Sequence, residues 1–293
     1  MAAVAAFAAG CSVSKKTVVK PSQAPRPLQS ATREQLIIRY NRQAEAIQSL
    51  NAAVKMKLTA GSAYTGVIEQ YHEVNGFLLA ERPANIRVIG QAPVVGKNVF
   101  DMVSDGKTFR IFIPSKSKFI VGSANLERQA AKPIENLRPQ HLLDALFWQP
   151  ISEGVPVLFE EANEAASHSY VLTVVRSQGD GGATQTTAAS SADWEISRKI
   201  WFDRTDLSVA RVETFGPGGK VNSDVRYSDW QPAGSSTFAR QIALTRPGND
   251  YELQIGINKL TVNEPVAAER FVLQQPPGAE LVTVGEEAKE PQP

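Results

Sequence analysis

Alternating apolar and polar residues, the period of a half-buried strand, occupy most of the chain. In VKMKLT, at 54–59, every second residue is apolar, and in TFRIFI the residues Phe109, Ile111 and Ile113 share one face. Similar runs lie at 67–73, 77–82, 85–90, 98–104, 118–122, 155–160, 169–176, 194–203, 208–215, 221–229, 237–246 and 251–262. Turn residues such as SDGK at 104–107 and GPGGK at 216–220 separate these runs, which therefore predict a succession of antiparallel strands.

Two segments have a helical period instead. Thr32 and Gln35 have the spacing of a capping box, and the apolar residues after them recur every three or four positions: Leu36, Ile37, Tyr40, Ala44, Ile47 and Leu50. A second helix is predicted at 138–147, where RPQHLLDALF carries an apolar stripe. With so many strands and only two helices, the chain is expected to be mainly β, with one large curved sheet or barrel.

The N-terminus predicts export and anchoring. Ala2 to Gly10 is a small or apolar run of about ten residues, half of what a membrane-spanning helix needs, and is typical of the end of a secretory signal. Ala8-Ala9-Gly10-Cys11 resembles the lipobox of bacterial lipoproteins, which implies a lipid anchor on Cys11. Ser12 follows the cysteine rather than aspartate, which implies the periplasmic face of the outer membrane. The alternative is an incidental cysteine in an unstructured N-terminus.

Composition then divides the chain into four parts. Residues 1–10 are interpreted as a signal-peptide remnant, and the proline-containing segment 11–30 as the lipid anchor with a disordered tether. The folded body is expected at 31–284, and GEEAKEPQP at 285–293 as a disordered tail. A low-complexity loop, QGDGGATQTTAASSAD, is expected at 178–193.

Charge and candidate chemistry exclude several functions. With 31 basic and 30 acidic residues the net charge is +1, so no broad field favours nucleic acid. The three histidines His72, His141 and His168 lie far apart, without the spacing of a metal site, and a surface or edge position is expected for each. Neither glycine-rich stretch has the Gly-Lys-Ser/Thr of a phosphate loop. No catalytic residues, metal or cofactor are therefore expected.

Several stretches resemble the fold of the lipoprotein carriers LolA and LolB, and in particular a group of LolB-related bacterial lipoproteins. They are ERPANIRV (81–88), MVSDGKTFRIFIPSKSKFIVG (102–122), IWFDRTDLSVARVETFGPGGKVNSDVRYSDW (200–230) and FVLQQPPGAELV (271–282). Four motifs carry the resemblance. Arg82-Pro83 is an Arg-Pro pair before a strand, and Asp105-Gly106 is an Asp-Gly turn. Phe202-Asp203 is a Phe-Asp strand end, and 271–276 is the start of a closing strand. The resemblance spans most of the folded body.

The resemblance implies an unclosed barrel of about eleven strands, with helices plugging its mouth and an apolar cavity for acyl chains of lipoproteins or lipids. The expected cavity residues lie on apolar faces and on the plug helix: Met56, Leu58, Phe100, Met102, Phe109, Ile111, Ile113, Leu142, Leu146 and Phe147. LolB engages the membrane through an exposed apolar loop residue. The comparable loop here, AGSAYTG, offers only Tyr64, and because an exposed tyrosine on a turn is usually incidental, no insertion mechanism is expected from it. Expected partners are acyl chains, the membrane and a periplasmic carrier protein. The alternative is an envelope protein-interaction or stress-sensor module with no transport role.

Overall fold

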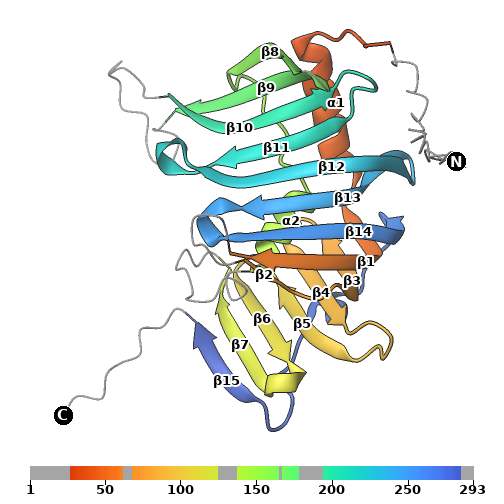
Figure 1. The fold of residues 1–293 in the computed structure, drawn as a ribbon, viewed down its shortest axis with the longest axis vertical. Helices are drawn as coiled ribbons and strands as arrows, with labels where there is room; N and C mark the ends of the chain where they lie inside the picture. The colour runs from red at the N-terminus through yellow and green to blue at the C-terminus, as the bar shows by residue number, and fades with distance from the viewer. Residues whose placement is uncertain (1–26, 62–67, 125–136, 165–166, 178–193, 285–293) are drawn as a thin grey trace, which may run out of the picture.

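The computed structural model describes residues 27–61, 68–124, 137–164, 167–177 and 194–284. These residues form one large curved sheet of fifteen strands with two α-helices against one of its faces (Figure 1). The mainly β, single-sheet fold predicted from sequence is confirmed, although the strand count exceeds the expected eleven. In the part of the chain that the structure describes, no helix has the length and apolar character needed to cross a membrane.

The strands follow the chain in order, with the two helices at its start and before the eighth strand. Their bounds are β1 Ser49–Ala60, β2 Glu69–Gln70, β3 Val74–Glu81, β4 Asn85–Gln91, β5 Asn98–Ser104, β6 Thr108–Ile113, β7 Lys118–Ser123, β8 Val157–Glu164, β9 Ser167–Ser177, β10 Trp194–Asp203, β11 Val209–Phe215, β12 Val221–Ala233, β13 Ser236–Arg246, β14 Tyr251–Val262 and β15 Glu280–Val284. The helices are α1 Arg33–Ala46 and α2 Pro139–Leu146.

The pairing of β1 with β14 joins two wings of the sheet. One wing runs from β3 through β7 to β15, and the other runs from β13 back through β8, while β2 pairs with β1 outside this path. Strands β15 and β8 stand at opposite ends of the order and do not pair with each other in the described residues. The sheet is therefore curved but unclosed, as Figure 1 shows.

The last strand differs from the sequence prediction. Phe271 ends a short 3-10 helix, Ala268–Phe271, and the strand begins only at Glu280. Strand β15 pairs with β7 in parallel, with Leu281 beside Phe119, whereas the other strand pairs of the described residues are antiparallel as expected. Residues 263–279 run from the end of β14 to this edge of the sheet, and Arg87 Nη1 of β4 donates a 2.9 Å hydrogen bond to Arg270 O along this segment.

Helix α1 begins at the predicted capping box. Gln35 N donates to Thr32 Oγ1 at 3.3 Å, and Thr32 N donates to Gln35 Oε1 at 2.9 Å, which satisfies two backbone groups at the helix start. Leu36, Tyr40 and Ala44 form its buried stripe. The helix ends at Ala46, and Leu50 belongs to β1, so the apolar period that suggested a longer helix spans a helix end and a strand start.

The face of the sheet that packs against α1 and α2 is called the inner face here. Its alternate residues form one buried cluster with both helices, because side chains along a strand point to opposite faces. Val54 of β1, Ile200 of β10 and Leu253 of β14 are each at most 3% exposed. The apolar residues of the alternating patterns therefore face inward, while Lys55 and Lys57 of β1 point to the opposite, outer face.

Candidate functional site

The predicted cavity residues lie on the inner face or on the plug helix, and most of them are buried. Seven are no more than 9% exposed: Met56, Leu58, Met102, Phe109, Leu142, Leu146 and Phe147. Phe100 and Ile111 are half-buried and pack against the same cluster, and Ile113 is half-buried at the end of β6. The structure thus brings residues from β1, β5, β6 and α2 to one side of the sheet.

Two of the predicted aromatic residues lie over glycines on neighbouring strands. A Cβ added to Gly122 of β7 would lie 2.7 Å from Cε1 of Phe109, and a Cβ added to Gly90 of β4 would collide with the ring of Phe100. Glycine is required at both positions because each ring approaches the backbone closely. Phe100 and Phe109 therefore cover the wall of the half-barrel rather than project far into its interior.

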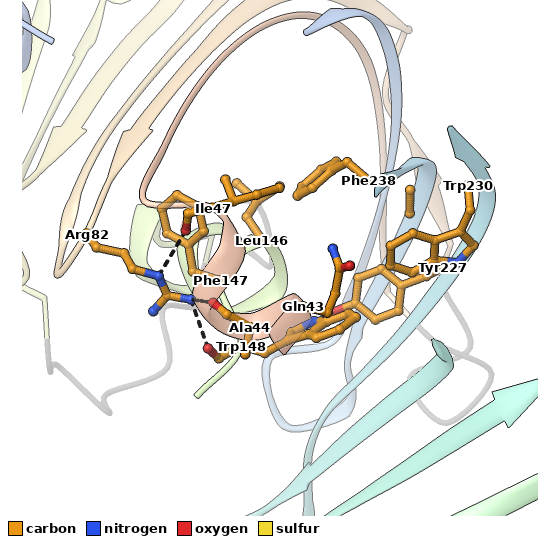
Figure 2. A pocket seen from close by; sticks show the side chains of 11 residues that line it. Gln43, Ala44, Ile47, Arg82, Leu146, Phe147, Trp148, Tyr227, Trp230 and Phe238 are labelled. Atoms are coloured by element: carbon orange, nitrogen blue, oxygen red, sulfur yellow. Dashed lines mark hydrogen bonds between the residues drawn. The ribbon is translucent and has the colours of Figure 1, made fainter. Parts of the chain in front are cut away.

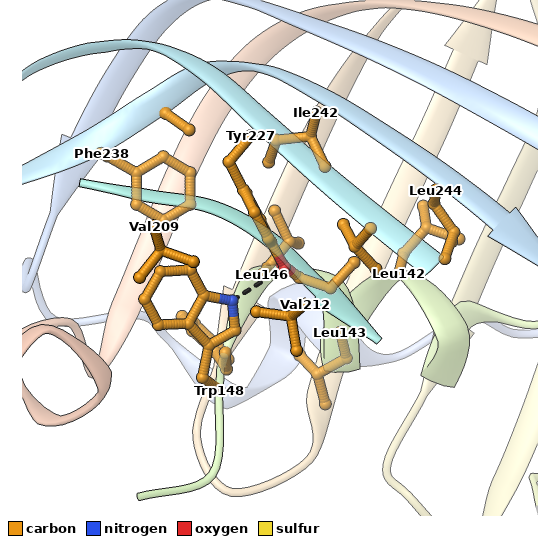
Figure 3. Close-up of a cluster of buried hydrophobic side chains, with 14 of the residues drawn as sticks. Leu142, Leu143, Leu146, Trp148, Val209, Val212, Tyr227, Phe238, Ile242 and Leu244 are labelled. Atoms are coloured by element: carbon orange, nitrogen blue, oxygen red, sulfur yellow. Dashed lines mark hydrogen bonds between the residues drawn. The ribbon is translucent and has the colours of Figure 1, made fainter. Parts of the chain in front are cut away.

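Helix α2 is the plug of the half-barrel. It contacts β4 and β5 on one wing and β13 on the other. Leu142, Leu143, Ala145 and Leu146 are buried, and Figure 3 shows Leu142 and Leu146 directed toward Tyr227, Ile242 and Leu244 of the sheet. Pro139 stands at the start of the helix, where its missing N–H costs no hydrogen bond. The apolar stripe predicted for 138–147 thus occupies the inner face.

An aromatic cluster holds the C-terminal end of the plug. Trp148 stacks on Tyr40 of α1 with ring centroids 5.2 Å apart, and Trp230 meets it edge-on at 6.0 Å. Trp148 Nε1 donates to Tyr227 Oη at 2.8 Å, and Tyr227 Oη donates to Ala145 O at 2.8 Å. Burial raises the pKa of the Tyr40 phenol to about 12 and raises that of Tyr227 further. Both hydroxyls are therefore neutral hydrogen-bonding groups.

Arg82 fastens the plug to the end of α1 (Figure 2). Its Nη2 donates to Ala44 O at 2.7 Å and to Trp148 O at 2.9 Å, and its Nε donates to Ile47 O at 3.2 Å. Its guanidinium carbon lies 4.8 Å from the centre of the Phe147 ring, and burial lowers the pKa of this arginine. The Arg82 guanidinium therefore donates hydrogen bonds to backbone carbonyls at the end of α1 and in the segment that follows α2.

The segment that follows the plug is also held from the other wing. Arg198 of β10 donates to Gln149 O and, at 3.0 Å, to Pro150 O. Asn41 of α1 exchanges two hydrogen bonds of 2.8 Å with the backbone of Ile151. The exit from α2 is therefore fixed by α1 and by both wings of the sheet.

Two hollows lie beside this segment. The smaller holds about 20 Å³, roughly one water molecule, and its lining includes Leu146, Phe147 and Trp148. The larger is an open groove of about 500 Å³ between the stretch 150–156 and strands β9 and β10, and Trp194 and Arg198 are among its lining residues. None of the ten predicted cavity residues lines the larger groove. In the described residues α2 fills the space beneath the sheet.

The hairpin between β4 and β5 exposes apolar side chains. Val94 is fully exposed and Val95 is 73% exposed, at the tip of a turn closed by Ala92 N donating to Lys97 O at 2.8 Å. Val94 has φ of 71°, a left-handed conformation that costs a β-branched residue of order 1–3 kcal/mol. No burial of the side chain offsets this cost. Cys11, predicted as the lipid anchor, and Tyr64 of the loop AGSAYTG lie outside the described residues.

The sequence did not indicate which polar residues face the interior of the half-barrel. The spacing of the three histidines is not that of a metal site, and in the described residues no three His, Cys, Asp or Glu side chains are grouped in a way that could hold a metal ion. His141, however, is not a surface residue, because its Nδ1 lies 2.6 Å from Tyr251 Oη inside the half-barrel. The tryptophans are scattered in the sequence, yet Trp148 and Trp230 meet. Only the pairing of distant strands brings these residues together.

The fold and the plugged inner face define a class of proteins, the unclosed β-barrels with a helical plug. No family model matches the sequence, and no curated protein is significantly similar to it. Among solved structures, a DUF1329 family protein from Desulfovibrio piger is 14% identical, with a TM-score of 0.52 over 81% of this chain and 94% of that one. This likeness shows a shared fold.

Two further solved structures have lower similarity. A LolA superfamily protein from Nitrosomonas europaea is 10% identical, with a TM-score of 0.46 over 83% of this chain and 99% of that one. A protein from Vibrio parahaemolyticus, described as an outer membrane lipoprotein-sorting domain, is 10% identical, with a TM-score of 0.46 over 80% and 94% of the two chains.

Proposed function

We propose that the protein binds an acyl chain, of a lipoprotein or of a lipid, on the inner face of its half-barrel, in the space that α2 occupies. The observation that supports this most directly is the plug itself. A helix of only eight residues brings Leu142, Leu143 and Leu146 into contact with both wings of the sheet. Its displacement would expose a continuous apolar surface without breaking a strand pair.

The free energy lost when the apolar side chains of the plug are withdrawn is similar to the free energy gained when an acyl chain is buried in their place. Withdrawing Leu142, Leu143 and Leu146 of the plug and Phe147 at its end would cost about 1.5–3 kcal/mol each, or roughly 6–12 kcal/mol. A chain of about sixteen carbons would recover roughly 13 kcal/mol at about 0.8 kcal/mol for each buried CH₂ group. An acyl chain can therefore offset the loss of the plug's apolar contacts, whereas a small polar ligand cannot. No catalytic group is needed for such binding.

The proposal includes location at the periplasmic face of the outer membrane, through a lipid on Cys11. The exposed Val94 and Val95 support a second membrane contact, because their hairpin tip carries Lys97 beside two solvated apolar side chains. In this arrangement the tip touches the bilayer and the half-barrel receives or delivers an acyl chain. A periplasmic carrier protein would be the partner in such a transfer.

The test uses the full chain carrying Cys11→Ser, purified without detergent from the periplasm of a bacterial host. Native mass spectrometry and titration with a fluorescent fatty acid measure the bound lipid. We expect Ile111→Asp to abolish binding, because Ile111 lies on the inner face against the core. Phe112→Asp is the matched control, since Phe112 is its half-buried neighbour on the outer face and pairs with Phe119 there. Equal loss in both variants, or an empty wild-type protein that takes up no fatty acid, would contradict the proposal.

A second candidate function is docking to another envelope protein. It is favoured by a row of apolar residues on the outer face. Phe77 of β3 pairs directly with Ile89 of β4. Asp101 of β5 lies between Ile89 and Phe112 of β6 and pairs with both. Phe77 is 50% exposed, which is unusual for a sheet surface that touches no partner. Cross-linking in the host envelope tests it. Loss of a specific cross-linked partner in Phe77→Asp, with fatty-acid binding unchanged, would support docking over ligand binding.

A further inference from the structure

Arg246, the last residue of β13, faces the interior of the half-barrel. Ile242 and Leu244 of the same strand are buried in the inner-face cluster, and side chains two residues apart share a face. The direct partner of Arg246 on β14 is Tyr251, which is 2% exposed and also points inward. An arginine and a tyrosine therefore stand side by side at the end of two neighbouring strands, on the inner face.

The start of the plug helix meets this pair. His141 Nδ1 of α2 lies 2.6 Å from Tyr251 Oη, and the two rings are roughly parallel with centroids 6.1 Å apart. Arg138, directly before α2, places its guanidinium carbon 5.0 Å from the centre of the Phe109 ring on β6. Four polar side chains, Arg138, His141, Arg246 and Tyr251, thus gather where the plug enters the half-barrel. We call this group the mouth cluster.

The mouth cluster is cationic. No carboxylate of the described residues lies within ion-pair distance of Arg246, whose Nε donates to Asn249 Oδ1 at 3.1 Å. Its terminal amino groups make no hydrogen bond with the described residues. Asp144 of α2 acts on Arg246 from further away, and its Oδ1 accepts a hydrogen bond from Gln140 at 3.0 Å. Burial and the charges of Arg246 and Arg138 lower the pKa of His141 to about 3, so this imidazole is neutral near pH 7.

We propose that the mouth cluster, through Arg246 and Tyr251, which belong to the sheet and not to the plug, binds the anionic head, a carboxylate or a phosphate, of an amphiphile whose chain lies on the inner face. This inference rests on the proposed acyl-chain binding and adds the chemical class of the ligand. The terminal amino groups of Arg246 form a planar fork that suits two oxygens of either anion, and a lysine would not match it. Leu244 and Leu253 continue inward from Arg246 and Tyr251, so a chain attached to the head passes directly onto apolar surface.

The experiment compares ligands that share a tail and differ in the head. The full chain carrying Cys11→Ser is titrated with oleate, oleyl alcohol, oleoyl lysophosphatidate and inorganic phosphate, by calorimetry. The variants are Arg246→Gln, Arg246→Lys and Arg226→Gln. Arg226 is the control because its side chain is 65% exposed on the outer face, where it lies 3.7 Å from Asp224. Circular dichroism and the unfolding midpoint report whether each variant folds.

The wild type and Arg226→Gln should bind oleate and lysophosphatidate more tightly than oleyl alcohol. Arg246→Gln should weaken the two anionic ligands about tenfold or more and change the alcohol less than twofold, because the lost contact is a charge-assisted one. Arg246→Lys should keep part of the preference, which separates lost charge from lost folding.

Other outcomes overturn the inference in distinguishable ways. Equal binding of oleate and oleyl alcohol, unchanged by Arg246→Gln, rejects the head-group site while the proposed acyl-chain binding stands. If the protein binds neither oleate nor oleyl alcohol, the head-group site and the proposed acyl-chain binding are both rejected. Binding of inorganic phosphate as tightly as lysophosphatidate, with loss of both in Arg246→Gln, shows a site for a free anion and rejects the amphiphile.

Discussion

The indole Nε1 of Trp148 donates a hydrogen bond of 2.8 Å to the phenolic oxygen of Tyr227, a residue 79 positions further along the chain. The same hydroxyl donates to Ala145 O at 2.8 Å. One buried tyrosine of β12 thus satisfies a donor and an acceptor at the end of the plug. Because both partners are buried, the closed position of α2 depends on this hydroxyl as well as on apolar contact.

Tyr227→Phe should destabilise the fold by about 1–3 kcal/mol, because it leaves the Trp148 N–H and the Ala145 carbonyl unpaired in an apolar surrounding. Urea denaturation followed by tryptophan fluorescence measures the change. Tyr71→Phe is the comparison, since the Tyr71 hydroxyl donates a 2.8 Å hydrogen bond to Glu69 at the surface, and its effect should be smaller than that of Tyr227→Phe. Equal small effects in both variants would show that the buried hydroxyl contributes nothing specific.

Gly90→Ala should also destabilise the fold, by about 1–3 kcal/mol, because the new methyl group meets the ring of Phe100. A second substitution, Phe100→Leu, should recover part of this loss by removing the collision. Gly248→Ala is the matched control, since a Cβ there meets no atom within 4 Å. Thermal unfolding of the four variants measures the coupling, and strict additivity of Gly90→Ala and Phe100→Leu would refute the contact.

Arg82→Lys should destabilise the fold by about 1–3 kcal/mol, although the charge is kept. A single ammonium group cannot reproduce the geometry with which the Arg82 fork meets the carbonyls of Ala44, Ile47 and Trp148. Chemical denaturation gives the loss, and faster hydrogen exchange in the segment after α2 locates it. Arg39→Lys, which affects one exposed 3.1 Å bond to Asp206 O, should have little effect.

Stability should fall as the pH is lowered from about 6.5 toward 3. The pKa of His141 is near 6.5 in the unfolded chain and about 3 in the folded one, so between these values only the unfolded state takes up the proton. Stability from this residue is therefore complete above pH 6.5 and is lost on acidification. His141→Gln, which can still accept from the Tyr251 hydroxyl, should flatten the pH profile of the unfolding free energy. A profile unchanged by the substitution would be inconsistent with a buried neutral imidazole.

Replacing both Val94 and Val95 with serine should weaken binding to lipid vesicles about tenfold or more, because two valine side chains lose burial in the bilayer surface. Both side chains are solvated in the structure and Val94 is β-branched in a left-handed conformation, so the double substitution should not lower the unfolding free energy. Flotation with vesicles of phosphatidylethanolamine and phosphatidylglycerol measures the binding, on the chain carrying Cys11→Ser. Ile68→Ser removes another exposed apolar side chain elsewhere and is the control. Similar losses in both variants would rule out a specific role for the hairpin tip.

The sequence by itself determined most of the elements and which residues of a strand share one face. The strands at 98–104, 194–203 and 251–262 have the bounds that their alternation predicts, and α1 starts at the Thr32 capping box. These features were predictable because period and capping depend on neighbours within a few residues. The predictions for the N-terminus, including Cys11, fall outside the described residues and stay predictions.

Only the tertiary structure decided which elements meet. The parallel pairing of β15 with β7 joins residues more than 150 positions apart, such as Phe119 and Leu281, and no local pattern specifies it. The same holds for the Trp148 and Tyr227 pair, and for Arg246, which local sequence shows only as a charged residue ending a strand. Its place beside His141 follows from the curvature of the sheet around α2. The physical reason is that alternation specifies a face, whereas strand order and curvature arise from packing the whole chain around one core.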